Sequence, residues 1–409
     1  MSDAQLDVVV FGATSFVGQI LCQYLTDTYG VDGELKWAAA GRSKDKLEQV
    51  KTKLGQAGAK LALLTADAND AASLDALCDQ TRVVVSTVGP YALYGEPMIR
   101  ACVNSGTDYC DLTGEVQWIA AMLEKYEDQA KQSGARIVHC CGFDSIPSDM
   151  GTYFLQQQAQ ARFKAPATRV KMRVKVAKGG VSGGTVASMM NIAEKAAKDP
   201  ALRKKLANPY LICPPNHGFS ARQESVSIPR NDEDFGAWAA PFVMDAINSR
   251  IVHRSNALNG KAYGDNFTYN EAMLAGPGMS GRLKALGIGA GTGLFFAAAA
   301  IKPTRWLLNK FVVPQPGEGP SPEAQKAGFY DIRLLGVTDN GDSIRVKVTG
   351  DADPGYGSTA KLLGQAAACL AQDISEDAPG GFWTTASLLG DPLLKRLQAK
   401  AGMTFAVID

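Results

Sequence analysis

The stretch VVVFGATSFVGQIL, residues 8–21, decides the fold of the first part of the chain. An apolar run, a glycine turn and an apolar-periodic segment predict a buried strand that turns tightly into a helix. Such a turn lets backbone N–H groups approach a pyrophosphate, and the helix N-terminus adds partial positive charge. Gly12 serves the turn and Gly18 allows close helix packing. Ser15 replaces the glycine of the commonest loop and, like Thr14, can donate a hydrogen bond to a phosphate.

A second glycine pattern, GPGMSG at residues 276–281, matches the usual spacing more literally. It follows EAMLA, contains Pro277 and shows no evident strand signal before it. The strand, turn and helix that the motif needs are therefore not predicted there. We expect a loop at this position rather than a second nucleotide site.

Regular alternation of strand and helix patterns continues to about residue 150. Apolar strands that alternate with helices of about 10–15 residues predict βαβ units. Such units form a parallel sheet with helices on both faces. The sequence therefore predicts an α/β fold, in which residues 1–150 form a Rossmann-type doubly wound nucleotide-binding domain.

The pattern changes after this first domain. TRVKMRVKVAKGG alternates with period two, and two alternating runs around Asn340-Gly341 predict a hairpin, because both turn residues tolerate positive φ. SVSIPR and NFTYNEAML are weaker strand candidates. We expect a second α+β domain with a largely antiparallel sheet over residues 151–355, a linker at 312–325, and helices in 356–409 that return to the first domain.

The end of the second expected strand bears on the choice of nucleotide. NAD-binding units usually place an acidic residue there for the ribose hydroxyls. Here the strand ends AAAGRSK, so Arg42, Ser43 and Lys46 follow it in place of an acidic residue. Arginine can pair with a 2′-phosphate, and basic residues are otherwise unfavourable at a helix N-terminus. We therefore predict NADP(H) rather than NAD(H).

Later strand ends should complete the cofactor site, because ligands bind beyond the carboxyl ends of parallel strands. Asp67 ends the third strand and can reach the adenine edge, and the chain bends after the fourth strand beside the expected nicotinamide ribose. The expected cofactor-binding residues are Gly12, Thr14, Ser15, Phe16, Val17, Gly18, Arg42, Ser43, Lys46, Asp67, Thr87, Val88, Gly89 and Pro90.

Candidate catalytic and substrate residues follow the later strands. Tyr91 and Tyr94, in GPYALYG, can each donate a proton or orient a carbonyl, although packing of both against a neighbouring helix is the favoured alternative. Glu115, Asp144 and Ser145 lie at two further strand ends and are candidates for substrate contact. The alternatives are that Glu115 complements the dipole of its own helix and that Asp144 or Ser145 caps the next one.

The quoted motifs together resemble the saccharopine dehydrogenase-like oxidoreductases. GATSFVG, WAAAGRS, STVGPYALYGEP, GTDYCDLTGE and CGFDSIPSD occur in that order within residues 6–151. The resemblance is closest to the branch that includes trans-acting enoyl reductases, and it resumes more thinly near the C-terminus. It implies a Rossmann domain, an inserted α+β domain and use of NADP. Ser15 departs from the usual middle glycine.

Composition excludes several other classes. The net charge is +1 and no Lys/Arg-rich run with interleaved aromatics occurs, so no nucleic-acid partner is expected. Eight scattered cysteines without a CxxC, and three histidines, offer no metal-binding spacing. His139 lies in an apolar strand and is expected to be buried and hydrogen-bonded. Free thiols, and an N-terminus without a basic region before its apolar run, favour a cytoplasmic location.

The uncharged run ALGIGAGTGLFFAAAAI, residues 285–301, leaves three interpretations open. It is marginal for a span, which needs about 20 apolar residues. A buried or subunit-interface helix is the first interpretation, and a transmembrane span is the last. Between them stands a patch over residues 285–313 that makes peripheral contact with membrane or lipid, because basic residues and Trp306 flank apolar ones in RWLLNKFVV.

The leading hypothesis is an NADPH-dependent oxidoreductase that reduces an enoyl or other lipid-linked C=C bond by hydride transfer. Its expected substrate is a small-molecule or carrier-bound acyl group, and we expect a homodimer. The alternatives are a saccharopine-type C–N oxidoreductase and a non-catalytic NADP-binding regulatory protein. Ser145 lacks a GxSxG elbow, which argues against a hydrolase.

Overall fold

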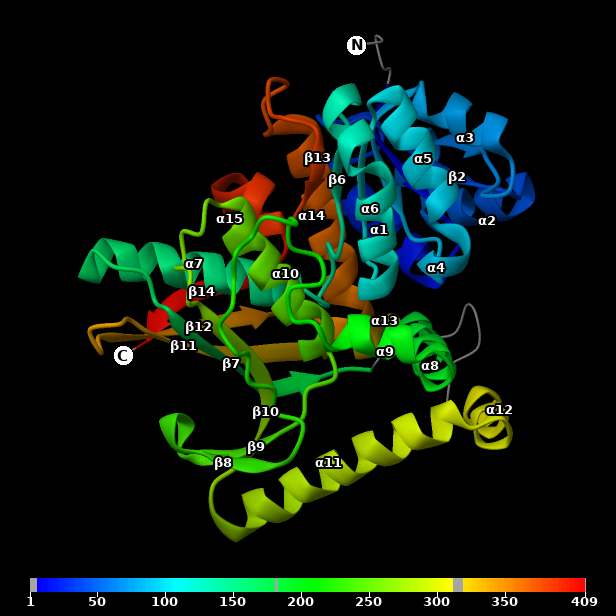
Figure 1. Ribbon diagram of the computed structural model, residues 1–409. Coiled ribbons are helices and arrows are strands. Elements are labelled where there is room, and N and C mark those ends of the chain that lie inside the picture. The colour runs from blue at the N-terminus through cyan, green and yellow to red at the C-terminus, as the bar shows by residue number, and fades with distance from the viewer. Residues whose placement is uncertain (1–5, 181–182, 312–318, 409) are drawn as a thin grey trace. The chain divides into compact units, whose positions relative to one another are not determined.

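The computed structural model describes residues 6–180, 183–311 and 319–408 (Figure 1). The chain divides into two compact units, each built around one seven-stranded sheet. The first unit comprises Met1–Phe143, Gln315–Gly319 and Gly355–Gly402. The second comprises Asp144–Pro314, Pro320–Pro354 and Met403–Asp409. Residues 312–318 of the expected linker lie outside the described residues.

The sheet of the first unit is entirely parallel, in the order β13-β6-β5-β4-β1-β2-β3. Its strands are β1 (Leu6–Phe11), β2 (Trp37–Gly41), β3 (Ala62–Thr65), β4 (Thr81–Ser86), β5 (Asp108–Asp111), β6 (Arg136–Val138) and β13 (Gly381–Trp383). Its helices are α1 (Phe16–Tyr29), α2 (Lys44–Lys53), α3 (Ala71–Cys78), α4 (Tyr91–Tyr94), α5 (Glu96–Ser105), α6 (Val116–Ser133), α14 (Thr359–Gln372) and α15 (Gly390–Lys400).

The apolar runs of the sequence form the centre of this sheet. The Val8–Val10 side chains of β1 are fully buried, as expected for a strand covered on both faces. The chain runs from β1 to β2 in one direction and from β4 to β5 in the other, and right-handed crossovers then place α1 and α5 on opposite faces. Reversal between β1 and β4 creates the switch point at which nucleotides bind in such sheets. The predicted α/β class is confirmed.

The C-terminal part of the first unit contains more than the two helices expected from its sequence. α14 packs on β1, β4 and β5, and it also contacts α1 and α15. Between the two helices, the short segment GFW forms β13, which pairs in parallel with β6. A three-residue strand carries no period that sequence analysis can detect, and only the sheet edge defines it.

The second unit contains a mixed sheet in the order β14-β12-β11-β7-β10-β9-β8, antiparallel except between β7 and β10. Its strands are β7 (Arg169–Lys178), β8 (Arg230–Asp232), β9 (Ala237–Ala240), β10 (Thr268–Gly276), β11 (Phe329–Val337), β12 (Ser343–Gly350) and β14 (Met403–Ile408). Its helices are α7 (Ile146–Phe163), α8 (Gly183–Lys198), α9 (Pro200–Ala207), α10 (Asp245–Leu258), α11 (Gly278–Ala300), α12 (Lys302–Phe311) and α13 (Pro322–Lys326).

Local signals in the second unit succeeded where they were strong. The hairpin around Asn340-Gly341 joins β11 to β12, and Gly341 has φ +88°. The expected strand at SVSIPR is wrong, because pairing begins only at Arg230, after that segment's apolar residues. Strand β14 was missed.

The uncharged run 285–301 lies in α11, a helix of 23 residues. This helix contacts β9, β10 and α8 (Figure 1). Only 11% of its most apolar window is buried, so the interpretation as a buried core helix is wrong. By length and composition alone the helix could cross a membrane.

Candidate nucleotide site and its surroundings

The loop between β1 and α1 requires glycine at two positions. Gly12 has φ +89°, and a Cβ there would lie 2.7 Å from both Thr87 Oγ1 and Val88 Cγ2. A Cβ on Gly18 would lie 2.3 Å from the Gly12 carbonyl oxygen. The β1–α1 loop, the end of β4 and the start of α1 therefore lie so close together that a side chain at Gly12 or Gly18 would not fit between them. This close approach is the backbone cradle that a pyrophosphate needs.

Ser15 supports the loop rather than offering a donor to a ligand. It is the N-cap of α1, and its Oγ accepts a hydrogen bond from Gly18 N at 2.9 Å. Thr87 Oγ1 donates to the Gly12 carbonyl at 2.9 Å, so Ser15 is the donor in the 2.9 Å contact between the two hydroxyls. The Ser15 proton is thus used inside the loop, and its predicted donation to a phosphate is corrected.

Backbone donors remain available at the start of α1. Phe16 N and Val17 N are the first amides of the helix, where geometry provides no intrahelical acceptor. They point along the helix axis toward its positive end, as phosphate-binding amides do. The Phe16 ring packs edge-on against Tyr356 with the centroids 4.9 Å apart, which fixes the first turn.

The end of β2 presents an unpaired cation. Arg42 is exposed, and within the described residues it has no hydrogen-bond or ion-pair partner. Ser43 is the N-cap of α2 and accepts from Lys46 N at 3.4 Å, so its side chain shapes the turn. Lys46 is also exposed. A positive pair at a helix N-terminus opposes the helix dipole and favours an external anion such as a 2′-phosphate.

The third and fourth strand ends lie where the sequence placed them. Asp67 follows β3, and its Oδ1 accepts from Asn69 N at 2.9 Å, which orders the turn before α3. Val88, Gly89 and Pro90 connect β4 to α4. These segments end at the same edge of the parallel sheet as the β1–α1 loop, since parallel strands share that edge.

Tyr91 is a structural residue. Its ring is 4% exposed and lies 5.4 Å from the Trp118 ring, and its hydroxyl donates to the Ser86 carbonyl at 2.8 Å. A proton held by a buried carbonyl is not available for donation, so the packing alternative holds for Tyr91. It does not hold for Tyr94, whose side chain is 42% exposed. Only Tyr94 of the predicted pair remains a candidate proton donor.

Glu115 anchors the segment that carries both tyrosines. It is fully buried, and its two carboxylate oxygens accept from Tyr91 N at 2.8 Å and Ala92 N at 3.3 Å. The carboxylate therefore complements the start of α4, and not its own helix, which was the alternative to substrate contact. A buried carboxylate that receives two amide hydrogen bonds holds this loop in place, and the predicted substrate contact is corrected.

A buried acid–histidine pair joins the ends of β5 and β6. Asp111 Oδ2 lies 2.7 Å from His139 Nδ1, and Asp111 Oδ1 accepts from Cys140 N at 3.1 Å. The imidazole packs against Trp118 and Phe382, with ring centroids 5.0 Å and 5.6 Å away. The prediction that His139 is buried and hydrogen-bonded is confirmed. Sequence analysis missed its partner, because 28 residues separate them along the chain.

Asp144 and Ser145 follow β6 and have different roles. Ser145 is the N-cap of α7, but its side chain makes no cap bond and instead donates to Asn248 Oδ1 at 2.9 Å, which corrects the capping alternative for Ser145. Asp144 is half-buried and, within the described residues, has no ion-pair or hydrogen-bond partner. Loss of hydration raises the pKa of Asp144 to about 7. This carboxyl can therefore hold a proton near neutral pH.

Glu271, on β10, is a second carboxyl whose pKa is raised. Asn248 Nδ2 donates to Glu271 Oε2 at 2.9 Å, and the Tyr269 hydroxyl donates to Oε1 at 2.6 Å. Burial is the larger cause and repulsion from Asp245 the smaller one, and together they raise the pKa of Glu271 to about 8. Sequence analysis did not single out Glu271, which occupies a fully buried position in a weakly patterned strand.

The second glycine pattern, GPGMSG, does lie between a strand and a helix, which the sequence did not predict. β10 ends at Gly276 and α11 begins at Gly278, so a strand, a turn and a helix are present. Both glycines have positive φ, +103° and +64°. The expectation of a simple loop is therefore wrong. Pro277 has no N–H, however, and β10 lies beside antiparallel β9 rather than at a switch point.

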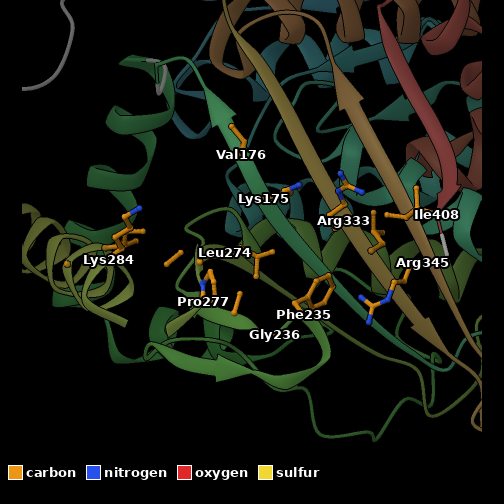
Figure 2. A pocket seen from close by; sticks show the side chains of 16 residues that line it. Lys175, Val176, Phe235, Gly236, Leu274, Pro277, Lys284, Arg333, Arg345 and Ile408 are labelled. Carbon is orange, nitrogen blue, oxygen red and sulfur yellow. The ribbon is translucent and has the colours of Figure 1, made fainter. Parts of the chain in front are cut away.

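An open groove of about 1030 Å³ borders this second loop (Figure 2). Its lining includes four basic side chains and no acidic one: Lys175, Lys284, Arg333 and Arg345. Arg333 is held by Asp331, with contacts of 2.6 and 2.8 Å. None of the predicted cofactor residues lines the groove. Within the described residues, no group of three or more His, Cys, Asp or Glu side chains could hold a metal ion.

The parallel sheet, its switch point and the glycine cradle define a dinucleotide-binding protein, and comparisons identify its family. Residues 8–138 match the saccharopine dehydrogenase NADP binding domain. A Mycobacterium tuberculosis protein provisionally named a trans-acting enoyl reductase is 39% identical, over 97% of this chain and 96% of its own. A trans-acting enoyl reductase of Mycobacterium bovis is 36% identical, over 97% of this chain and 96% of its own. The chain belongs to this saccharopine dehydrogenase-like family of NADP-binding oxidoreductases, as the sequence motifs predicted.

A solved structure shares the overall fold of this chain. A saccharopine dehydrogenase (L-Glu forming) of Saccharomyces cerevisiae aligns over 99% of this chain and all of its own, with a TM-score of 0.53 and 13% identity. At this identity the likeness concerns the fold alone.

Proposed function

We propose that this protein uses NADPH to reduce a C=C bond conjugated to a thioester carbonyl, on an acyl group linked to a carrier or lipid. The observation that carries the proposal is the similarity, along nearly the whole chain, to proteins named trans-acting enoyl reductases. The glycine cradle and the unpaired Arg42 support the choice of NADPH. When bound, this cofactor supplies a hydride, and the protein supplies binding, orientation and a proton.

The residues that would hold NADPH fall into two sets. The amides of Phe16 and Val17, at the glycine loop, fit the pyrophosphate. Arg42, with Lys46 nearby in sequence, fits the 2′-phosphate. The Ser15 and Thr87 hydroxyls, which hydrogen-bond to each other and to the Gly12 carbonyl, would keep the loop in shape.

Asp144 is the proposed proton donor. Addition of hydride to the β-carbon leaves an enolate, and protonation of the α-carbon completes the saturated thioester. Asp144 carries a proton near neutral pH because its pKa is raised to about 7. It is also the covalent neighbour of Phe143, whose amide is fixed by Thr359 Oγ1 at 3.0 Å.

The test measures loss of NADPH absorbance with a panel of enoyl thioesters, both on coenzyme A and on an acyl carrier protein. Saturated thioesters of the same length serve as controls for non-specific oxidation. Turnover of the enoyl compounds alone supports the proposal. Tight NADPH binding without turnover across the panel would instead favour a regulatory protein, and NADP⁺-dependent oxidation of saccharopine would favour the C–N oxidoreductase.

The role of Asp144 has its own signature. If the protonated carboxyl is the donor, the reduction rate falls as pH rises through about 7, because the acid form is lost. Asp144→Asn should slow reduction by about 100-fold, a loss within the usual range for one general acid, and should flatten this pH profile. Tyr94→Phe is the matched comparison. If Asp144→Asn keeps the wild-type rate and pH profile while Tyr94→Phe slows reduction, Tyr94 would be the proton donor instead.

A further inference from the structure

Helix α11 carries its large apolar side chains on the outside. Five of them follow helical spacing along one exposed face, which we call the outer stripe: Met279, Leu283, Leu286, Leu294 and the C-cap residue Ile301. Their exposed fractions are 65, 64, 46, 72 and 55%, in that order. The buried positions of the same helix are small, namely Gly281, Ala285 and Ala299. A surface helix of a globular protein normally has the reverse distribution, with large apolar residues facing the core.

The small inner face holds α11 close to its own unit. A Cβ on Gly289 would lie 2.7 Å from Pro229 Cγ, so this turn of the helix touches the chain before β8 directly. The Arg282 guanidinium lies 5.4 Å from the Trp238 ring centroid of β9. Figure 1 shows the first part of α11 beside β8 and β9 and the rest of the helix running on toward α12, and α11 also contacts β10 and α8. A helix fixed in this way presents its outer stripe sideways, as an interfacial helix does, and does not span a bilayer.

The elements around the stripe are positively charged. No acidic residue occurs between Glu271 and the end of α12. Helix α8, which contacts α11, and helix α9, which follows α8 and contacts it, add further cations. The basic residues of α8, α9, α11 and the part of α12 up to residue 308 are Lys195, Lys198, Arg203, Lys204, Lys205, Arg282, Lys284, Lys302 and Arg305, and the acidic ones, with the N-cap of α9 included, are Glu194 and Asp199. This excess lies on one region of a chain whose net charge is only +1.

Helix α12 extends the same surface. Trp306 and Leu307 are 58% and 47% exposed. Arg305 is held by Glu194 at 2.9 Å, which ties α12 to α8. Tryptophan beside basic residues is typical of side chains that lie at the level of lipid headgroups.

We propose that the outer stripe, together with Trp306 and Leu307, docks this protein on an anionic lipid membrane. Apolar side chains enter the boundary between headgroups and acyl chains, while the surrounding lysines and arginines contact anionic headgroups. A second copy of the chain fits less well, because two-fold packing of this surface would bring two positively charged regions together. The proposal goes beyond the proposed reduction and does not depend on it.

The experiment is vesicle flotation of the full chain at moderate salt. Vesicles of phosphatidylcholine containing about one third phosphatidylserine should carry most of the protein, and pure phosphatidylcholine should carry several-fold less. The double variant Leu283→Ser/Leu294→Ser should lose at least nine tenths of this binding. Lys284→Glu/Lys302→Glu should lose the preference for anionic vesicles.

Leu93→Ser is the matched control, because Leu93 is 59% exposed but belongs to the other unit, and its binding should equal the wild type. Unchanged NADPH affinity shows that each variant is folded. Equal binding to both vesicle types, or wild-type binding by the double variant, overturns the proposal. A third result would also overturn the proposal: the protein does not bind vesicles, is a dimer in solution, and becomes a monomer in the double variant. That result would assign the outer stripe to contact with a second copy.

Discussion

The two glycine loops of this chain look alike locally and differ in what surrounds them. Each connects a strand to a helix, and each places its first glycine at positive φ, Gly12 at +89° and Gly276 at +103°. The closing glycine is equally tight in both, since a Cβ would lie 2.3 Å from the Gly12 oxygen or 1.9 Å from the Gly276 oxygen. Within the described residues, only the first loop lies at a switch point of a parallel sheet, with the unpaired Arg42 beside it. The glycine spacing describes a tight turn, whereas the neighbouring strands make it a nucleotide site.

The largest expected effect separates the loops at their first glycine. In Gly12→Ala the new Cβ meets Thr87 and Val88, each at 2.7 Å, so the cradle must open. We expect NADPH affinity to fall at least 100-fold, which corresponds to about 2.7 kcal/mol. Gly276→Ala is the control, because nothing lies within 4 Å of its Cβ and only backbone strain of about 1–2 kcal/mol is added. Calorimetric titration with NADPH measures both, and equal losses would remove the distinction between the loops.

The strands that lead into the two loops differ in charge. β1 is apolar at its centre, whereas β10 buries Glu271, whose pKa is raised to about 8. The folded state therefore keeps a proton that the unfolded state releases near pH 4, so stability declines as pH rises toward about 8, by at most about 1.4 kcal/mol per pH unit. In Glu271→Gln this decline should shrink. Urea unfolding from about pH 6 to about pH 8 measures it, and parallel curves for the two proteins would contradict the assignment.

Arg42 tests whether charge beside the first loop selects the cofactor. Arg42→Glu should reduce NADPH affinity at least tenfold relative to NADH, about 1.4 kcal/mol, because a carboxylate would repel the 2′-phosphate. Arg282→Glu, in the helix after the second loop, should leave both affinities unchanged. Fluorescence titration with the two nucleotides gives the ratio. An unchanged preference in Arg42→Glu would assign the 2′-phosphate to other residues.

Ser15 gives the smallest effect. Ser15→Ala removes the N-cap bond to Gly18 and the contact with Thr87, each 2.9 Å long, and should cost about 1 kcal/mol in the free energy of unfolding. NADPH affinity should fall only modestly, since the Ser15 proton is already used within the loop. Ser280→Ala, in the second loop, should change stability by less than about 0.5 kcal/mol. Thermal and urea unfolding compare the two, and a larger loss of affinity than of stability would restore Ser15 as a ligand contact.

Sequence analysis succeeded where a pattern is local and failed where partners are distant. The Val8–Val10 run, the Gly12 turn and the Asn340-Gly341 hairpin all have short-range causes, namely a run of apolar residues or residues that tolerate positive φ. Tyr91 and Tyr94 look equivalent in GPYALYG, and only the contacts of Tyr91 with Ser86 and Trp118 distinguish them. The context of the second loop was misjudged, because β10 has weak alternation and depends on β7 and β9 for its pairing.

The sequence by itself determined the parallel α/β unit, the position of the glycine loop, the absence of an acid after β2 and the family of the chain. These features rest on periodicity, on the conformational range of glycine and on residue type, which are properties of short segments. Only the tertiary structure decided that the Ser15 and Glu115 side chains support loops, that partial burial raises the pKa of Asp144 and that α11 turns its large residues outward. Burial and hydrogen-bond partners depend on segments far apart in the chain, and those segments meet only after folding.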